Sequence, residues 1–259
     1  MHRLTPISLE ELCQEAAMLT RMDRKYILWE EQMDEVVEKL DPATKVLEID
    51  GQRSQPYRSV YFDTPNMDSF YMAVHPRRRK FKVRIRQYVN SEIAFAEVKA
   101  RGARGVTVKE RIPIPWDVAE SHSLGEAEPW VREKLGLTEP LVPTMWGSYE
   151  RQTLLMPDGG RATIDRHMDW ANGRGDYVTV PGLVIVETKS GSRPSALDKR
   201  LWGAGIRPQK ISKFGTGMAA LDETLPRNRW HRVLNTYFAG AKHSKKDSHL
   251  ISPAVAAVS

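Results

Sequence analysis

Alternation within two short segments constrains the fold of this chain more than any other feature. In the segment 80–86, Lys or Arg occupies every second position and Phe, Val or Ile fills the positions between. In the segment 184–189, Glu187 and Lys189 share one face of an extended chain, and Val184 and Val186 line the other. Because successive side chains of a strand point to opposite faces, both segments predict strands with one charged face and one apolar face.

Several such strands joined in a barrel would have an apolar outside, on which helices can pack, and a charged inside. Buried charge is costly unless opposite charge accompanies it, so such an interior predicts an anionic, phosphate-rich ligand. We therefore expect an α+β fold, an antiparallel β-barrel of about eight strands with helices packed on its outside.

The bulk composition is that of an ordinary globular protein with a basic bias. The chain has 259 residues, a formal net charge of +6 and a single cysteine, Cys13. The charge favours an anionic partner, but nucleic acid, phosphorylated metabolites and anionic membranes all stay open on charge alone. Cys13 cannot form an internal disulfide, and we expect it to be a small apolar residue on an N-terminal helix. No apolar segment approaches the ~20 residues that span a bilayer, and residues 1–10 lack a signal core, so a soluble cytoplasmic protein is expected.

Turn signals and hydrophobic spacing divide the chain into helices and strands. Helices are expected at 8–18, 33–40, 126–137, 195–204 and 213–221. Strands are expected at 21–28, 45–50, 58–62, 79–89, 93–101, 106–113, 141–153, 160–170, 177–180 and 183–188. These elements predict one domain over residues 1–222, including its N-terminal helix, and a basic, poorly ordered extension over residues 223–259.

Motifs for common nucleotide, zinc and serine-hydrolase chemistry are absent from the sequence, which has no GxxxxGK[ST], GxGxxG, HExxH or GxSxG. What remains is a set of charged and polar residues that one face of successive strands would gather: Lys25, Lys82, Arg84, Arg86, Glu97, Lys99, Lys109, Arg111, Arg161, Thr163, Asp165, Glu187 and Lys189. For any one strand, solvated outward charge is the default interpretation. The consistently apolar opposite faces favour a ligand-binding interior instead.

Phosphate chemistry accounts for this mixture of charges. Arg forks bind phosphate oxygens bidentately, and Lys acts as a point charge. A carboxylate is a poor phosphate ligand but a good ligand for Mg²⁺ or Mn²⁺, which can bridge phosphate oxygens. Glu187 is the first candidate metal ligand and Glu97 the second. The alternative for each is an internal salt bridge, to Lys189 or to Lys99 respectively.

A series of short motifs along the chain matches a known family. The motifs are Arg24-Lys25-Tyr26, Tyr61-Phe62-Asp63-Thr64, Val83-Arg84-Ile85-Arg86-Gln87-Tyr88, Glu97-Val98-Lys99, Lys109-Glu110-Arg111, Thr163-Ile164-Asp165-Arg166, Glu187-Thr188-Lys189 and Lys210-Ile211-Ser212-Lys213-Phe214. In number and order they resemble the VTC (vacuolar transporter chaperone) domain, the polyphosphate polymerase branch of the CYTH-like triphosphate tunnel metalloenzymes. The resemblance runs from residue 20 to residue 222.

The resemblance implies an antiparallel β-barrel whose polar tunnel binds triphosphate or polyphosphate with a divalent metal, Mn²⁺ or Mg²⁺. Polymerases of this family transfer the γ-phosphate of ATP to a growing polyphosphate chain and release ADP. By the resemblance, Glu187 matches the metal-binding glutamate, and Arg151 joins the phosphate-holding residues. With the strand faces, this gives catalytic candidates Lys25, Arg84, Arg86, Lys99 and Arg161, and substrate-binding candidates Lys82, Lys109, Arg111, Arg151, Lys189, Lys210, Ser212 and Lys213.

The expected partners are ATP and inorganic polyphosphate, with no nucleic acid. Asp23 stands where many tunnel relatives outside this branch have the glutamates of an ExExK strand, which argues against a second, hydrolytic metal site. Export of a product would need a membrane-protein partner. Two alternatives stay open: a triphosphate hydrolase using the same tunnel, and a non-catalytic polyanion-binding module. In such a module, Tyr57, Tyr61 and Tyr88 would stack on single-stranded nucleic acid.

Overall fold

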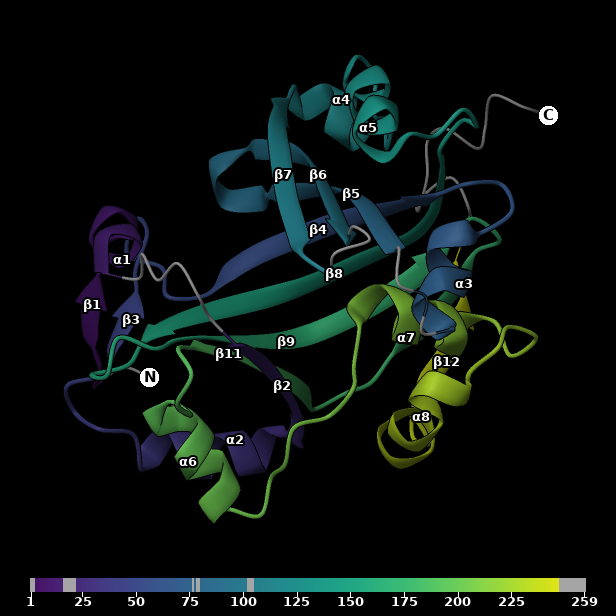
Figure 1. Ribbon diagram of the computed structural model, residues 1–259. Helices are drawn as coiled ribbons and strands as arrows, with labels where there is room; N and C mark the ends of the chain where they lie inside the picture. Colours follow the sequence, from purple (N-terminus) through teal and green to yellow (C-terminus); the bar gives the residue numbers. More distant parts are fainter. Residues whose placement is uncertain (1–2, 16–21, 76, 78–79, 102–104, 247–259) are drawn as a thin grey trace. The chain divides into compact units, whose positions relative to one another are not determined.

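The computed structural model describes residues 3–15, 22–75, 77, 80–101 and 105–246. These residues form twelve strands and eight α-helices, and the strand pairings are mostly antiparallel (Figure 1). The chain divides into two compact units. The first unit comprises Met1–Gln55, Tyr149–Met168 and Pro181–Ile211, and the second comprises Pro56–Ser148, Asp169–Val180 and Ser212–Ser259.

The first unit is built around strand β11. Its elements are β1 (Thr5–Ile7), α1 (Leu9–Glu15), β2 (Met22–Trp29), α2 (Glu30–Glu38), β3 (Lys45–Leu47), β11 (Leu183–Ser190), α6 (Ala196–Gly203) and parts of β8 (Val142–Leu155) and β9 (Arg161–Asn172). Antiparallel pairing places Glu187 of β11 between Lys25 of β2 and Thr163 of β9. The N-terminal β1 instead pairs in parallel with β3.

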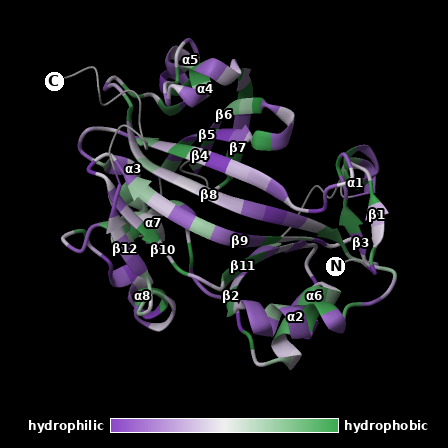
Figure 2. Ribbon diagram, turned by 180° about the vertical axis from the view of Figure 1, so that it is seen from behind, coloured by the Kyte–Doolittle hydropathy of each residue, from purple (hydrophilic) through white to green (hydrophobic). Residues whose placement is uncertain are grey.

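One face of these strands is apolar and is covered by helices. Tyr26, Val184 and Val186 are buried in a core with residues of α2 and α6. In α2, Met33, Val36 and Val37 supply the buried stripe, as the spacing of apolar residues predicts. Figure 2 shows hydrophilic and hydrophobic segments on both helices, as expected for helices that pack with one side. The predicted apolar face with helical cover is therefore confirmed in this unit.

The second unit contains a meander of four antiparallel strands. Its elements are β4 (Gln55–Asp63), α3 (Asp68–Val74), β5 (Lys80–Tyr88), β6 (Ile93–Arg101), β7 (Thr107–Ile114), α4 (Trp116–Glu120), α5 (Ala127–Leu135), β10 (Asp176–Thr179), α7 (Lys213–Leu221), α8 (His231–Tyr237) and β12 (Lys242–Lys245). The register of the meander places Tyr61 opposite Arg84, Arg84 opposite Glu97, and Glu97 opposite Arg111. Short 3₁₀ turns lie at Val89–Ser91 and Asn228–Trp230.

The meander repeats the two-faced pattern of the first unit. Val83, Ile85 and Val98 are buried in a core that includes Ala119 and Val131, which belong to α4 and α5. The basic residues of β5 occupy the opposite face, because strand side chains alternate. The charged face and the apolar face predicted from the segment 80–86 are both present.

Helix α7 explains the sequence Gly215-Thr216-Gly217. Ser212 caps the helix by accepting a hydrogen bond from the backbone N–H of Gly215. A Cβ atom on Gly215 would collide with the ring of Trp230, and one on Gly217 would collide with the ring of Trp170. The two glycines therefore allow close packing inside a buried helix.

Several expectations need correction. Among the described residues no strand pairing closes the sheet into the expected barrel. The sequence did not predict β1, α3, α4, α8 or β12. Cys13 does lie on a helix, but its side chain is exposed rather than buried. In the predicted C-terminal extension, residues 228–237 form a 3₁₀ turn and α8, and β12 pairs with β10.

Some expectations fall outside the described residues: positions 16–18 of the N-terminal helix, position 21 of the first predicted strand, position 79 of the strand predicted at 79–89, and residues 247–259. The domain boundary at residue 222 stays a prediction. Within the described residues, every helix is too short or too polar to cross a membrane.

Candidate functional site

Four side chains of the second unit form what we call the Arg84 cluster: Arg84, Arg86, Glu97 and Lys109. They come from β5, β6 and β7, whose alternation places them on one face. Arg84 donates to one carboxylate oxygen of Glu97 through Nε (2.7 Å) and Nη2 (2.5 Å). Lys109 Nζ donates to the other oxygen at 3.1 Å. Glu97 is only 3% exposed, so its carboxylate is a buried anion that is bonded through both oxygens.

Electrostatics keep Glu97 ionised. Burial raises the pKa of its carboxyl group, but the charges of Arg84, Arg86 and Lys109 outweigh this and lower the pKa to about 2. Burial lowers the pKa of Lys109, against the opposing effect of Glu97. Three basic groups thus surround one carboxylate, and an excess of positive charge remains on this face. Such an excess suits an anionic ligand.

Further predicted residues lie near this cluster in the second unit. Lys82 Nζ donates to Ser212 Oγ at 2.7 Å, which joins β5 to the start of α7. The ring of Tyr61 stacks on Phe214 of α7 (5.2 Å between centroids) and lies 6.0 Å from the Arg84 guanidinium. These contacts bring Lys82, Ser212 and Arg84 together around two aromatic rings.

The remaining candidates of the second unit are more exposed or differently paired. Lys99 is exposed and lies opposite Lys82 on one side and Lys109 on the other. Arg111 stacks its guanidinium 4.3 Å from the ring centroid of Phe95. Lys213 is the first residue of α7, and its carbonyl accepts a hydrogen bond from Trp170.

The first unit holds a second group, which we call the Glu187 cluster: Lys25, Arg151, Asp165, Glu187 and Lys189. Lys25 Nζ donates to one carboxylate oxygen of Glu187 at 2.7 Å, and Lys189 Nζ lies 3.2 Å from the other. Burial raises the pKa of Glu187, but Lys25 and Lys189 reverse this and hold the pKa far below its ordinary value. These side chains keep some exposure, 32% for Lys25 and 20% for Glu187, so a ligand can reach them.

Arg151 is held in place by a buried carboxylate of the same cluster. Its Nε and Nη2 donate to the two oxygens of Asp165 at 2.6 and 2.9 Å, and Asp165 is fully buried. Arg161 of β9 lies opposite Lys189 in the pairing of β9 with β11. Lys210 is exposed and follows Gln209, whose backbone N–H donates to the carbonyl of Lys25. The predicted candidates of this unit therefore lie on or beside the same strands.

The two clusters offer a divalent metal few carboxylates: Glu97 in the Arg84 cluster, and Glu187 together with the arginine-bound Asp165 in the Glu187 cluster. The described residues contain no group of three or more His, Cys, Asp or Glu side chains that could hold a metal ion. Both oxygens of Glu97 and both of Glu187 face basic groups. The salt-bridge alternative is thus realised for both, although Glu97 pairs with Arg84 and Lys109 rather than with Lys99. Mg²⁺ is commonly bound through one or two carboxylates together with substrate phosphates, so Glu187 fits a metal that arrives with phosphate.

The sequence left the roles of several residues in these clusters unassigned. It placed Asp165 on the charged face of β9, two positions from Thr163, but it did not predict that Asp165 binds Arg151. Phe214 lies next to the basic motif at Lys210–Lys213, but nothing in the sequence indicates its stacking on Tyr61. On the opposite face of the first unit, Asp198 of α6 accepts hydrogen bonds from Tyr26 (2.6 Å) and Thr188 (2.5 Å). These bonds fasten the helix to the back of the strands that carry Lys25 and Glu187.

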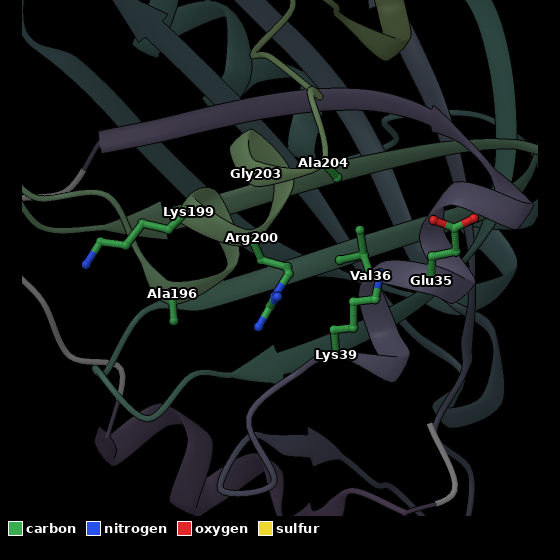
Figure 3. A pocket seen from close by; sticks show the side chains of 8 residues that line it. All are labelled: Glu35, Val36, Lys39, Ala196, Lys199, Arg200, Gly203 and Ala204. Carbon is green, nitrogen blue, oxygen red and sulfur yellow. The ribbon is translucent and has the colours of Figure 1, made fainter.

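A pocket of about 460 Å³ lies between α2 and α6 of the first unit (Figure 3). Its lining includes Lys39, Lys199 and Arg200, and Figure 3 shows that the last two come from α6. Both helices cover the apolar face of β2 and β11, so this pocket lies on the other side of those strands from Glu187. None of the predicted site residues lines it, which makes its lysines suitable control positions.

A known family and several solved structures resemble this chain. A family model of the VTC domain matches residues 20–222. Curated proteins give no match. Among solved structures, a candidate adenylate cyclase of Vibrio parahaemolyticus has 12% identity, covers 74% of this chain and 94% of its own, and gives a TM-score of 0.44. A candidate adenylyl cyclase of Hippeastrum with a dominant triphosphatase activity has 14% identity, coverages of 80% and 100%, and a TM-score of 0.46. A Pyrococcus horikoshii protein has 13% identity, coverages of 76% and 97%, and a TM-score of 0.45.

Proposed function

Because this chain belongs to the VTC domain family, we propose that it is a polyphosphate polymerase, which transfers the γ-phosphate of ATP to the end of a growing inorganic polyphosphate chain. Family membership supports the broader class, a polyphosphate-related enzyme. The observation that carries the finer proposal is the Arg84 cluster, where three basic groups surround one buried carboxylate. A strand face of this kind is suited to phosphoryl groups, which carry charge on every unit.

The reaction needs no dedicated general base. The nucleophile is a terminal phosphate oxygen of the polyphosphate chain, which is already anionic at neutral pH. This oxygen forms a bond to the γ-phosphorus of ATP, the bond from that phosphorus to the β,γ-bridging oxygen breaks, and ADP leaves with the electron pair. Catalysis then consists of alignment and neutralisation of charge.

In the second unit, we assign phosphate contacts to Arg84 and Arg86, with Lys99 as a further catalytic group. Glu97 holds the guanidinium of Arg84 through two hydrogen bonds, so this fork is oriented before a ligand binds. Preorganised charge costs no reorganisation during the reaction. The supporting substrate-binding residues of this unit are Lys82, Lys109, Arg111, Ser212 and Lys213.

In the first unit, we assign Lys25 and Arg161 to catalysis, with Arg151, Lys189 and Lys210 as substrate-binding residues. A divalent metal, Mn²⁺ or Mg²⁺, would neutralise phosphate charge when bound. Glu187 is the carboxylate that would hold it, and phosphate oxygens would supply further ligands. Lys25 and Lys189 release the Glu187 carboxylate by turning to phosphate oxygens, which offer them equivalent ionic hydrogen bonds.

The test is incubation of the purified protein with ATP and either Mn²⁺ or Mg²⁺, with ADP, orthophosphate and acid-labile polymer assayed together. ADP and polymer phosphate formed in equal amounts would support the proposal. Orthophosphate without polymer would replace it with a triphosphate hydrolase. Tight polyphosphate binding without turnover would replace it with a binding module. The Lys199→Ala variant, altered on the far side of β2 and β11, should behave as the unaltered protein.

A further inference from the structure

Three aromatic rings gather on the polar face of β4, β5 and β6. Tyr57 and Tyr88 lie opposite each other, with ring centroids 4.9 Å apart and planes tilted by 56°. Tyr88 meets Phe95 edge to face, with centroids 5.9 Å apart. All three side chains are partly exposed. They share this face with Arg84 and Glu97, since positions of equal parity on a strand point the same way.

Arginine guanidinium groups lie against these rings. Arg86 lies 5.5 Å from the ring centroid of Tyr57, and Arg111 lies 4.3 Å from that of Phe95. Rings and guanidinium planes in such contact form a platform for flat π systems, because both stack on a base. Inorganic polyphosphate has no π system and would gain nothing from the rings.

Two buried polar atoms beside this platform, one on Arg86 and one on Ser59, lack a hydrogen-bond partner among the described residues. Arg86 is 8% exposed and Ser59 is 1% exposed, and the two lie directly opposite each other in the pairing of β4 with β5. Among the described residues, neither Nε of Arg86 nor Oγ of Ser59 has a hydrogen-bond partner. Buried polar groups are nearly always satisfied, so two adjacent exceptions indicate a ligand that brings acceptor atoms.

We propose that Tyr57, Tyr88 and Phe95 form a nucleobase-binding subsite, in which Arg86 and Ser59 donate to acceptor atoms of the bound nucleotide. This proposal rests on the proposed function, in which ATP is the phosphate donor. The subsite is the part of the protein that would bind the base of ATP, which an inorganic phosphate donor lacks. Arg84 and Arg86 lie two residues apart on one strand face, roughly 7 Å along the strand. A nucleotide with phosphates at the Arg84 cluster therefore has its base within reach of the rings.

The test compares two ligands that share a triphosphate but differ in the base. Calorimetry measures binding of a non-hydrolysable ATP analogue and of inorganic tripolyphosphate, both with Mg²⁺. Tyr57→Leu and Tyr88→Leu should each raise the dissociation constant of the ATP analogue about tenfold, because each variant loses one stacking contact. Tripolyphosphate binding should stay unchanged. The matched control is Tyr71→Leu, which removes a partly exposed tyrosine of α3 elsewhere in this unit and should affect neither ligand.

Tyr88→Phe keeps the ring and should bind the ATP analogue like the unaltered protein, which separates stacking from loss of fold. Equal weakening of both ligands in the leucine variants would overturn the proposal, because the rings would then only position the arginines. Unchanged binding of both ligands would overturn it as well. Binding is measured without turnover, so this test is independent of the polymerase assay. The subsite can be present in a protein that makes no polymer, and a protein that makes polymer can lack the subsite.

Discussion

The ion pair between Arg84 and Glu97 predicts that stability and activity can be separated at one position. Arg84→Ala removes two hydrogen bonds to a carboxylate that is 3% exposed. A hydrogen bond to a charged group contributes about 1.5–3 kcal/mol to the free energy of unfolding. Removal of one partner of a buried ion pair lowers that free energy by about 3–5 kcal/mol. Lys109 still bonds Glu97, so the free energy of unfolding should fall by about 2–3 kcal/mol. The fold should survive, but polymer synthesis should be lost.

The double variant Arg84→Ala/Glu97→Gln sharpens this prediction. In Arg84→Ala the buried Glu97 carboxylate keeps only Lys109 as an ion-pair partner, so removing its charge with glutamine should restore part of the lost stability. Synthesis should not return, because the guanidinium to which we assign a phosphate contact is still missing. Urea unfolding of the two single variants, the double variant and the unaltered protein gives the coupling energy of the pair. ADP and polymer assays on the same four proteins give the activity.

Two results would refute this reasoning. A coupling energy below about 0.5 kcal/mol would mean that Arg84 and Glu97 act independently. Synthesis by Arg84→Ala at the rate of the unaltered protein would remove Arg84 from the site. Lys199→Ala controls for the loss of one positive charge outside either cluster.

Three further predictions concern other features. Glu187→Gln should abolish synthesis yet retain or tighten polyphosphate binding, measured by calorimetry, because it leaves two lysines without their carboxylate; weakened binding would contradict this. The pKa of Glu97 is about 2 when folded, against an ordinary 4.5. The ionised carboxyl group therefore contributes about 3 kcal/mol to the free energy of unfolding above pH 4.5, and this contribution is lost as the pH falls to 2. Acid unfolding experiments should show the loss, and Glu97→Gln should make the free energy of unfolding depend less on pH in this range. Gly217→Ala should lower the free energy of unfolding by about 1–3 kcal/mol through collision with Trp170, whereas Gly240→Ala, which has open space, should leave the melting temperature unchanged.

Local alternation made the faces of the strands predictable. Lys82, Arg84 and Arg86 must share a face in any extended chain, and the structure has them so with Val83 and Ile85 opposite. The helices α2, α6 and α7 were predictable for the same reason, since their apolar spacing is local. Closure of a barrel depends on pairing between strands distant in sequence, and local pattern does not determine it.

The ion-pair partner of Glu97 was also hard to predict from the sequence, because it lies on a neighbouring strand. As the alternative to metal binding, the sequence offered Lys99, two positions along the same strand, as the salt-bridge partner of Glu97. The connection after β5, a 3₁₀ turn followed by Glu92 with φ of 48°, instead sets a register that places Arg84 directly opposite Glu97. A change of one residue in this connection would alter the register and hence the partner. Loop geometry therefore decides which cation meets the carboxylate.

The buried Glu97 lets the protein mature without its ligand. Without an anion, Arg84, Arg86 and Lys109 would repel one another and lower the stability of the unliganded protein. Glu97 occupies the place of that missing charge. The charges of this face are therefore partly balanced in the unliganded protein, and its folding should not depend on the phosphate concentration.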